Sequence, residues 1–276
     1  GITADSEVPV GGEMRLGEDG EPNGLFLNRA VTMIDAALPP PSREELMERV
    51  LAGLDRMARD GYVTVHDAGL DSEQMAVLET LEAEGRLPIR VYAMLSLRDE
   101  DLIRRWLQRG PDRDNDSMLV TRAVKAYYDG ALGSRGARLL YDYEDQPGHR
   151  GISGDGYGFD QALNAEAMKA GFQVAIHAIG DAAVRQCLDA IEAAIDANGR
   201  RGNRHHVSHI QMFDPADIPR FAELGVIAAM QPTHATSDMY WAGERLGEAR
   251  AARRRLGGDR WRLPLQLLRL DRKSVV

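Results

Sequence analysis

Three side chains suited to metal chemistry stand late in runs of residues that are typical of buried strands. Lys125 follows the apolar run 119–124, His177 lies near the end of the run 174–179, and His209 lies near the end of the run 205–210. Parallel strands of one sheet present their carboxyl ends at the same edge. The three residues therefore predict a metal site at the C-terminal rim of an α/β barrel.

Lysine and histidine would contribute differently to such a site. A neutral imidazole is a good metal ligand, whereas a lysine ammonium has no lone pair and cannot bind a metal ion. Lys125 would have to be deprotonated or carbamylated by carbon dioxide, and the carbamate is an anionic oxygen ligand that can bridge two metal ions. Each residue also has a structural alternative, because a strand lysine can extend its ammonium to water and a strand histidine can be a hydrogen-bonded core residue.

Further polar residues follow the ends of predicted strands and could contact a substrate. Asp129 could orient Lys125 or a substrate amine, and Arg135 could bind a carboxylate or form an ion pair at the surface. His66 could be a ligand, a substrate contact or a hydrogen-bonding residue at a strand end. His234 could line the mouth of the site.

The composition is that of a soluble globular protein with one large domain. The 276 residues include 43% hydrophobic and 28% charged side chains, and the formal net charge is −9. This charge argues against nucleic acid or an anionic membrane as the main partner. The single cysteine, Cys187, excludes an intramolecular disulfide. No apolar run approaches the roughly twenty residues that span a bilayer and no leader is recognised, so a cytoplasmic location is expected.

Strands and helices alternate along the middle of the chain. The patterns predict strands at 62–67, 88–95, 119–128, 172–178, 205–210 and 226–232, and helices at 42–60, 72–85, 99–109, 161–170, 181–198 and 215–224. Ser42 begins a capping box, and Asp181 is predicted to cap its helix. The alternation predicts a parallel sheet, which an open doubly wound sheet and a closed barrel would both satisfy. No nucleotide-binding glycine motif follows any strand.

The two ends of the chain differ from the middle. Residues 1–41 are rich in Gly, Glu and Pro and predict a loop-rich segment with a hairpin, while residues 42–247 form the barrel region. From 248 to 276, arginines are scattered among leucines with a poor helical period. We expect this tail not to be the native continuation, as after a reading-frame error or in a truncated clone.

Several short motifs resemble the amidohydrolase family 3 group of the amidohydrolase superfamily, which includes N-substituted formamide deformylase. They are Val65-His66-Asp67-Ala68, Val124-Lys125, Asp129-Gly130-Ala131-Leu132-Gly133-Ser134-Arg135, His177-Ala178-Ile179-Gly180-Asp181, His209 with Gln211, and Gln231-Pro232 with His234. The resemblance spans roughly residues 10–247.

The resemblance implies a (β/α)8 TIM-type barrel that holds one or two divalent ions, usually zinc. It implies that Lys125, His177 and His209 stand at the metal positions of the fourth, fifth and sixth strands. The reaction implied is hydrolysis of amide- or formamide-type C–N bonds in a small-molecule substrate by a metal-activated water. The remaining site residues are expected to be Asp129 and His234 as catalytic residues, and His66, Arg135 and Gln211 as substrate contacts.

The chain also departs from the family pattern. The His-x-His pair of the first barrel strand and the aspartate of the eighth strand are absent, so the six predicted strands correspond to strands two to seven. We therefore expect an incomplete barrel, an internal fragment of such an enzyme with weak or no activity. Two unpaired strand edges would favour association, for instance as a homo-oligomer.

Two other functions fit the same residues. A non-catalytic binding or scaffold protein derived from a barrel would keep the motifs only as structure, and its metal content would be low. A phosphotriesterase-like or lactonase-like barrel hydrolase would also use a bridging lysine, and a panel of amides, lactones and phosphotriesters would distinguish it.

Overall fold

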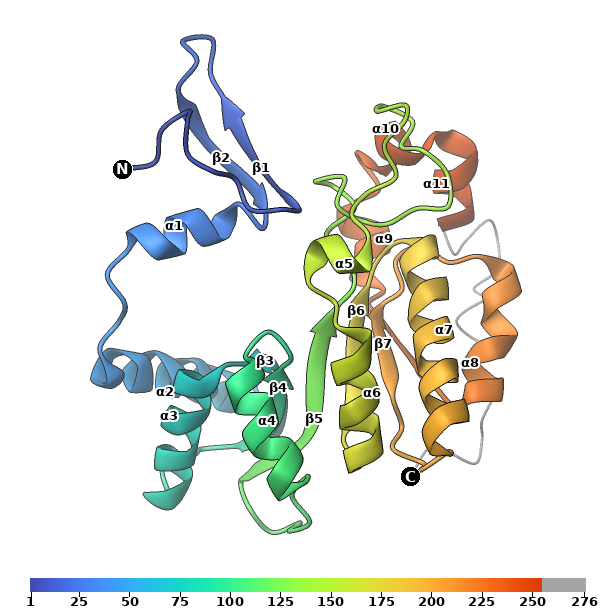
Figure 1. The fold of residues 1–276 in the computed structure, drawn as a ribbon. Coiled ribbons are helices and arrows are strands. Elements are labelled where there is room, and N and C mark those ends of the chain that lie inside the picture. The colour runs from blue at the N-terminus through green and yellow to red at the C-terminus, as the bar shows by residue number, and fades with distance from the viewer. Residues whose placement is uncertain (255–276) are drawn as a thin grey trace. The chain divides into compact units, whose positions relative to one another are not determined.

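The computed structural model describes residues 1–254, with side chains described as far as residue 251. Contacts divide the chain into two compact units. One contains residues 1–38, 127–159 and the chain from 176 onward, and the other contains residues 39–126 and 160–175. Figure 1 labels the elements of both units.

The predicted strands form one parallel sheet in the order β3-β4-β5-β6-β7-β8. They are β3 (Thr64–Leu70), β4 (Arg90–Ser96), β5 (Leu119–Tyr127), β6 (Gln173–Ala178), β7 (His206–His209) and β8 (Ile227–Met230). A doubly wound sheet reverses its strand order at a switch point, whereas a TIM-type barrel places its strands in sequence order. The observed order therefore fits six consecutive strands of a TIM-type barrel and excludes the doubly wound alternative.

Residues 39–126 and 160–175 form an α/β layer whose helices follow the predicted pattern. The helices are α2 (Arg43–Arg59), α3 (Ser72–Ala83), α4 (Glu100–Arg109) and α6 (Gln161–Ala170). The predicted capping box is confirmed, because the Ser42 hydroxyl accepts from the Glu45 N–H and the Glu45 carboxylate accepts from the Ser42 N–H. Asp71 and Gln74 form a second capping box at α3.

The other unit contains the long helix α7 (Asp181–Asn198), which lies beside α8 (Ile218–Leu224) (Figure 1). Arg185 of α7 pairs with Asp217 in the short 3-10 helix η1 (Pro215–Asp217), which leads into α8. The predicted hairpin is confirmed as β1 (Gly12–Leu16) paired with β2 (Pro22–Asn28). Tertiary contacts therefore join segments that are distant in sequence within this unit.

Some expectations for local structure were wrong. Asp181 is the first residue of α7 rather than its cap, and Gly180 occupies the cap position. Short helices also occur that the sequence patterns did not predict: α1 (Val31–Ala37), α5 (Gly154–Tyr157), α9 (Thr233–Ser237), α10 (Ala242–Leu246) and α11 (Glu248–Arg254). Helix α11 includes the start of the arginine-rich tail, and the rest of that tail lies outside the described residues. Helices of one or two turns carry too few residues for a visible apolar period.

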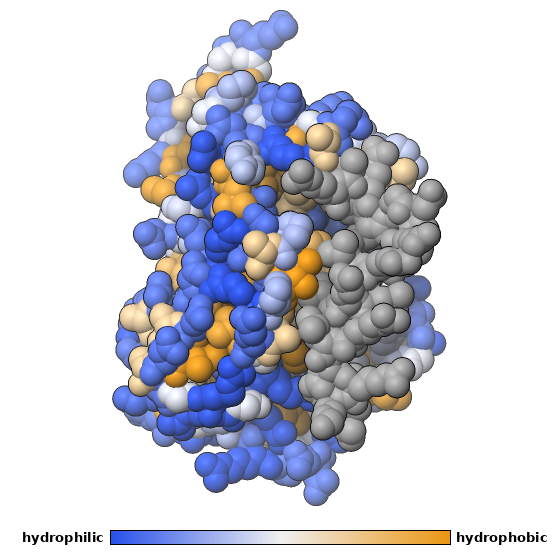
Figure 2. Space-filling view, turned by 90° about the vertical axis from the view of Figure 1, so that its right-hand side faces the viewer, coloured by the Kyte–Doolittle hydropathy of each residue, from blue (hydrophilic) through white to orange (hydrophobic). Residues whose placement is uncertain are grey.

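The surface is in keeping with the charged composition. On the face shown in Figure 2, hydrophilic residues cover most of the area outside the grey residues, and apolar residues form separate patches. In the part of the chain that the structure describes, helices long and apolar enough to cross a bilayer are absent.

His205 introduces a pH dependence into the stability of the fold. Its side chain is 8% exposed, and burial lowers the pKa of the imidazole from 6.5 to about 4. The unfolded chain therefore binds this proton at a higher pH than the folded chain. We predict that acidification from pH 7 to pH 4 removes roughly 3 kcal/mol of unfolding free energy through this residue.

The measurement is urea unfolding of the wild-type chain and of His205→Gln at several pH values. The variant should lose less stability on acidification than the wild-type chain, because its neutral amide does not titrate. His149→Gln is the matched control and should follow the wild-type profile. Equal acid sensitivity of the wild-type chain and His205→Gln would contradict the prediction.

Candidate active site

A buried carboxylate organises the end of β6. Asp129 is 0% exposed and lies just after β5. Its Oδ1 accepts from the Ile179 N–H at 2.9 Å, and its Oδ2 accepts from the N–H groups of Gly180 at 2.9 Å and Arg138 at 2.8 Å. These bonds join the segment after β5, the loop that follows it and the start of α7.

Glycine is required where these segments meet. A Cβ atom on Gly180 would lie 1.9 Å from the Arg138 carbonyl oxygen, so no other residue fits without moving the backbone. Gly130 and Gly136 both pack against the side-chain amide of Asn28. A Cβ atom on either glycine would lie 2.8 Å from Asn28 Oδ1. The glycine-rich motif after β5 and the Gly180-Asp181 motif are therefore explained by close backbone packing.

Asp129 also faces the first candidate ligand. His177 Nε2 lies 3.6 Å from Asp129 Oδ1, an electrostatic pairing longer than an ordinary hydrogen bond. Burial raises the pKa of Asp129 to about 7, although the three backbone N–H groups act in the opposite direction. The Tyr128 N–H donates to the His177 carbonyl at 2.9 Å, which holds the backbone of His177.

The second candidate ligand lies against the first in a strained segment. The rings of His177 and His209 meet edge to face with centroids 4.4 Å apart. His209 and Ile210 have φ angles of 77° and 46°, a conformation that is unfavourable for residues with a Cβ and rare for β-branched ones. The Ile210 N–H donates to the Ala178 carbonyl at 3.0 Å, which holds the turn against the end of β6.

A glutamine bridges His209 and His234. Gln231 Oε1 contacts His209 Nδ1 and lies 2.8 Å from His234 Nε2. An amide oxygen only accepts hydrogen bonds, so both rings must donate to it. His209 is thereby fixed with its proton on Nδ1 and its lone pair on Nε2.

Asp238 completes the polar network at the far side of His234. Its Oδ2 lies 3.6 Å from His234 Nδ1 and accepts from Gln211 Nε2 at 2.6 Å. Gln211, expected to contact a substrate, is 8% exposed and is held in this network. Gln231 and Asp238 were missed as functional residues, although the spacing of four between His234 and Asp238 is typical of side chains that meet on a helix.

Lys125 and His66 belong to the unit that contains residues 39–126. Lys125 is 4% exposed near the end of β5, and it stands opposite Ser96 in the parallel register with β4. His66 on β3 stacks on Tyr92 with ring centroids 4.6 Å apart, and burial lowers the pKa of its imidazole.

Arg135 is already engaged by a carboxylate of the chain. Its guanidinium binds Asp145 through two hydrogen bonds of 3.0 and 2.7 Å, and Arg245 also pairs with that carboxylate. To bind a substrate carboxylate, Arg135 would have to leave Asp145. Of the two roles that the sequence suggested for Arg135, this geometry favours the ion pair at the surface.

The donor set has a consequence for metal binding. Within residues 1–254, the structure brings together no group of three His, Cys, Asp or Glu side chains that could hold a metal ion. Two neighbouring imidazoles are suitable ligands for a divalent cation such as zinc. A third ligand would then have to be a group other than His, Cys, Asp or Glu, or a residue outside the described part of the chain.

Comparisons with known proteins agree with this architecture. The profile of the amidohydrolase family matches residues 1–266, and the chain belongs to this family. The amidohydrolase YtcJ of Bacillus subtilis is 31% identical over 91% of the chain and 47% of its own length. N-substituted formamide deformylase of Arthrobacter pascens is 24% identical over 84% of the chain and 44% of its own length.

Solved structures show the same relationship. An uncharacterized metal-dependent hydrolase from Pyrococcus furiosus superposes with a TM-score of 0.69 and 26% identity, over 81% of this chain and 45% of that protein. The chain thus spans about half the length of the relatives that it matches.

The Asp129 network makes a testable prediction about stability. Asp129→Asn keeps the side-chain size but replaces one acceptor oxygen by an amide donor, so at least one of the three buried N–H groups loses its acceptor. We expect the unfolding free energy to fall by about 1–3 kcal/mol in urea denaturation. Asp189→Asn, which changes an exposed carboxylate paired with Arg220, should leave stability nearly unchanged. An Asp129→Asn chain as stable as the wild type would refute this role.

Proposed function

We propose that this chain is part of a metal-dependent hydrolase that cleaves amide- or formamide-type C–N bonds in small molecules. Membership of the amidohydrolase family supports hydrolysis. The similar Pyrococcus protein is titled a metal-dependent hydrolase, and the similar Arthrobacter protein is named a formamide deformylase. Both names support the reaction class without identifying a substrate.

The observation that carries the proposal is the pair of oriented imidazoles at the ends of consecutive strands. His209 carries its proton on Nδ1, from which Gln231 Oε1 accepts a hydrogen bond. His177 Nε2 faces Asp129 Oδ1 at 3.6 Å. A fixed tautomer at His209 and a carboxylate beside His177 are supporting features that metal-binding histidines commonly have.

The proposed third ligand is Lys125 as a carbamate. Burial disfavours the charged form of an amine, and a neutral amine can react with carbon dioxide. Lys125 stands near the end of β5, as His177 and His209 stand near the ends of β6 and β7. Two imidazoles and an anionic oxygen suit zinc, although other divalent ions accept the same ligands.

A bound divalent ion supplies a Lewis acid and lowers the pKa of a coordinated water. The chain's own residues then have separable roles in the proposal. Asp129 holds His177 in position, and His234, placed between Gln231 and Asp238, is the candidate to move a proton to or from the leaving amine. The proposed substrate contacts are His66 and Gln211.

Metal content tests the proposal directly. After equilibration with zinc and bicarbonate followed by gel filtration, elemental analysis should find about one zinc ion per chain. His177→Ala, His209→Ala and Lys125→Ala should each lose most of it. Lys125→Glu should retain more zinc than Lys125→Ala, because a carboxylate replaces the carbamate oxygens.

His149→Ala is the matched control and should keep the wild-type zinc content. A wild-type chain without zinc would refute the metal proposal and favour a scaffold role. Turnover is tested separately with N-formyl amines, N-acyl amines, lactones and phosphotriesters. If lactones or phosphotriesters were hydrolysed in preference to amides, the C–N assignment would be wrong.

The bridging glutamine gives an independent prediction. Gln231→Leu removes the acceptor for His209 Nδ1, so the ring is no longer held in the ligand tautomer. We expect zinc affinity, measured by competition with a chromogenic chelator, to fall about 10- to 100-fold. Gln173→Leu, an amide-to-apolar change away from these imidazoles, is the control. Unchanged affinity in Gln231→Leu would show that this bridge does not prepare a ligand.

A further inference from the structure

The sequence contains two Asn-Gly pairs, Asn23-Gly24 and Asn198-Gly199. An asparagine that precedes glycine can lose its side-chain amide, because the glycine nitrogen can attack Cγ and glycine has no Cβ atom to hinder the approach. The attack requires an accessible amide close to this nitrogen and a main chain that can close into a cyclic imide. The structure gives the two pairs different surroundings in each of these respects.

Asn23 and Gly24 lie in an irregular part of the hairpin. In the register of β1 with β2, residues 23–25 stand opposite the single residue Arg15, so the regular ladder is interrupted here. Gly24 has a φ angle of 91°, which an extended strand does not adopt, and a Cβ atom added there would meet no atom within 4 Å. The main chain at this pair is therefore held neither by regular strand geometry nor by close packing.

The Asn23 side chain is exposed and is turned toward the residues that follow it. Its Oδ1 accepts a hydrogen bond from the Leu25 N–H at 3.0 Å. This contact is an Asx-turn, in which the side chain bends along the main chain on the side where the Gly24 nitrogen lies. Attack of that nitrogen on Cγ moves negative charge onto Oδ1, and a donor already placed at Oδ1 stabilises this charge. The bond engages the oxygen and not Nδ2, the group that must leave.

Asn198 is the last residue of α7 and is only partly exposed. The Gly199 N–H donates to the Ile195 carbonyl at 2.7 Å. Because the nitrogen must give up its proton before it can attack, this hydrogen bond opposes the reaction. The helical hydrogen bonds also fix the backbone dihedral angles of Asn198, which would have to change for the ring to close.

We propose that Asn23 is a site of spontaneous deamidation in the folded chain, and that Asn198 is protected by α7. The Gly24 nitrogen loses its proton to hydroxide and forms a bond to Asn23 Cγ, and the Cγ–Nδ2 bond breaks. Nδ2 takes a proton from water and leaves as ammonia, which regenerates hydroxide, and a cyclic imide joins the two residues. Water then adds to either imide carbonyl and gives aspartate or isoaspartate. The reaction needs only water and hydroxide, and nothing is oxidised or reduced.

The modification adds a carboxylate at an exposed position of the hairpin. Both products replace a neutral amide by an acid that is ionised at neutral pH. Isoaspartate also lengthens the main chain, because the chain then runs through Cβ and Cγ of residue 23. The extra length falls where the ladder is already irregular, so the regular pairs on either side can be kept.

The test follows both sites in the same purified chain by peptide mapping and mass spectrometry. Trypsin places the two pairs in separate peptides, residues 16–29 and 186–200, and fragmentation locates the new acid within each. During incubation of the folded chain at mildly alkaline pH, Asn23 should deamidate about tenfold or more faster than Asn198. The rate at Asn23 should rise with pH, because hydroxide removes the proton of the attacking nitrogen.

Incubation in concentrated urea separates the effect of the fold from that of the local sequence. Unfolding should raise the rate at Asn198 to that at Asn23, while the rate at Asn23 changes little. In the folded variant Asn23→Ser, the fast modification of residues 16–29 should disappear and Asn198 should react as slowly as before. The proposal is overturned if Asn23 stays intact, if Asn198 reacts as fast as Asn23 in the folded chain, or if unfolding accelerates both sites equally.

Discussion

One carboxylate, that of Asp129, connects the parts of the chain from which the candidate active site is built. It accepts hydrogen bonds from three backbone N–H groups that belong to the start of α7 and to the loop after β5. Such groups are costly when buried without an acceptor. The same carboxylate faces His177, so the bonds that satisfy the backbone also orient a candidate metal ligand. Stability and site geometry therefore depend on a single side chain.

In the candidate site, each histidine proposed to bind the metal ion has a polar side chain beside its ring. His177 has Asp129 beside it, and His209 has Gln231, which also contacts His234. The positive φ angles of His209 and Ile210 show that the backbone leaves β7 in an unfavourable conformation, which the bond to the end of β6 holds in place. Backbone strain together with a fixed tautomer at His209 is typical of a functional site rather than of a simple core.

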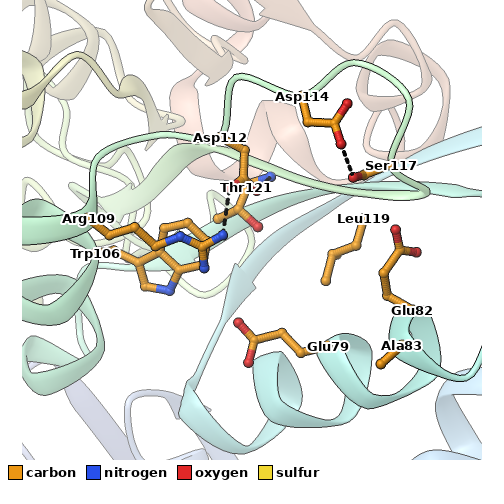
Figure 3. A pocket seen from close by; sticks show the side chains of 10 residues that line it. All are labelled: Glu79, Glu82, Ala83, Trp106, Arg109, Asp112, Asp114, Ser117, Leu119 and Thr121. Atoms are coloured by element: carbon orange, nitrogen blue, oxygen red, sulfur yellow. Dashed lines mark hydrogen bonds and ion pairs between the residues drawn. The ribbon is translucent and has the colours of Figure 1, made fainter.

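A β-bulge at Arg122 gives β5 two different surroundings along one strand. Before the bulge, Leu119 and Thr121 line a cavity beside α3 and α4 (Figure 3), and after it Ala123 faces the opposite side. Arg122 itself holds the loop that follows α4.

The amino-acid sequence by itself determined the alternation of strands and helices, the capping box at Ser42 and the family to which the chain belongs. These features depend on residues close together in the sequence or on motifs of a few residues. Strand order required the tertiary structure, because a barrel and a doubly wound sheet share the same local periodicity. The same holds for Asp129, which the sequence suggested as a substrate contact. Its acceptor bonds reach backbone groups as far as 51 positions away, and only folding brings such groups together. Gln231 was missed for the same reason, because the histidine that it contacts, His209, lies 22 positions away in the sequence.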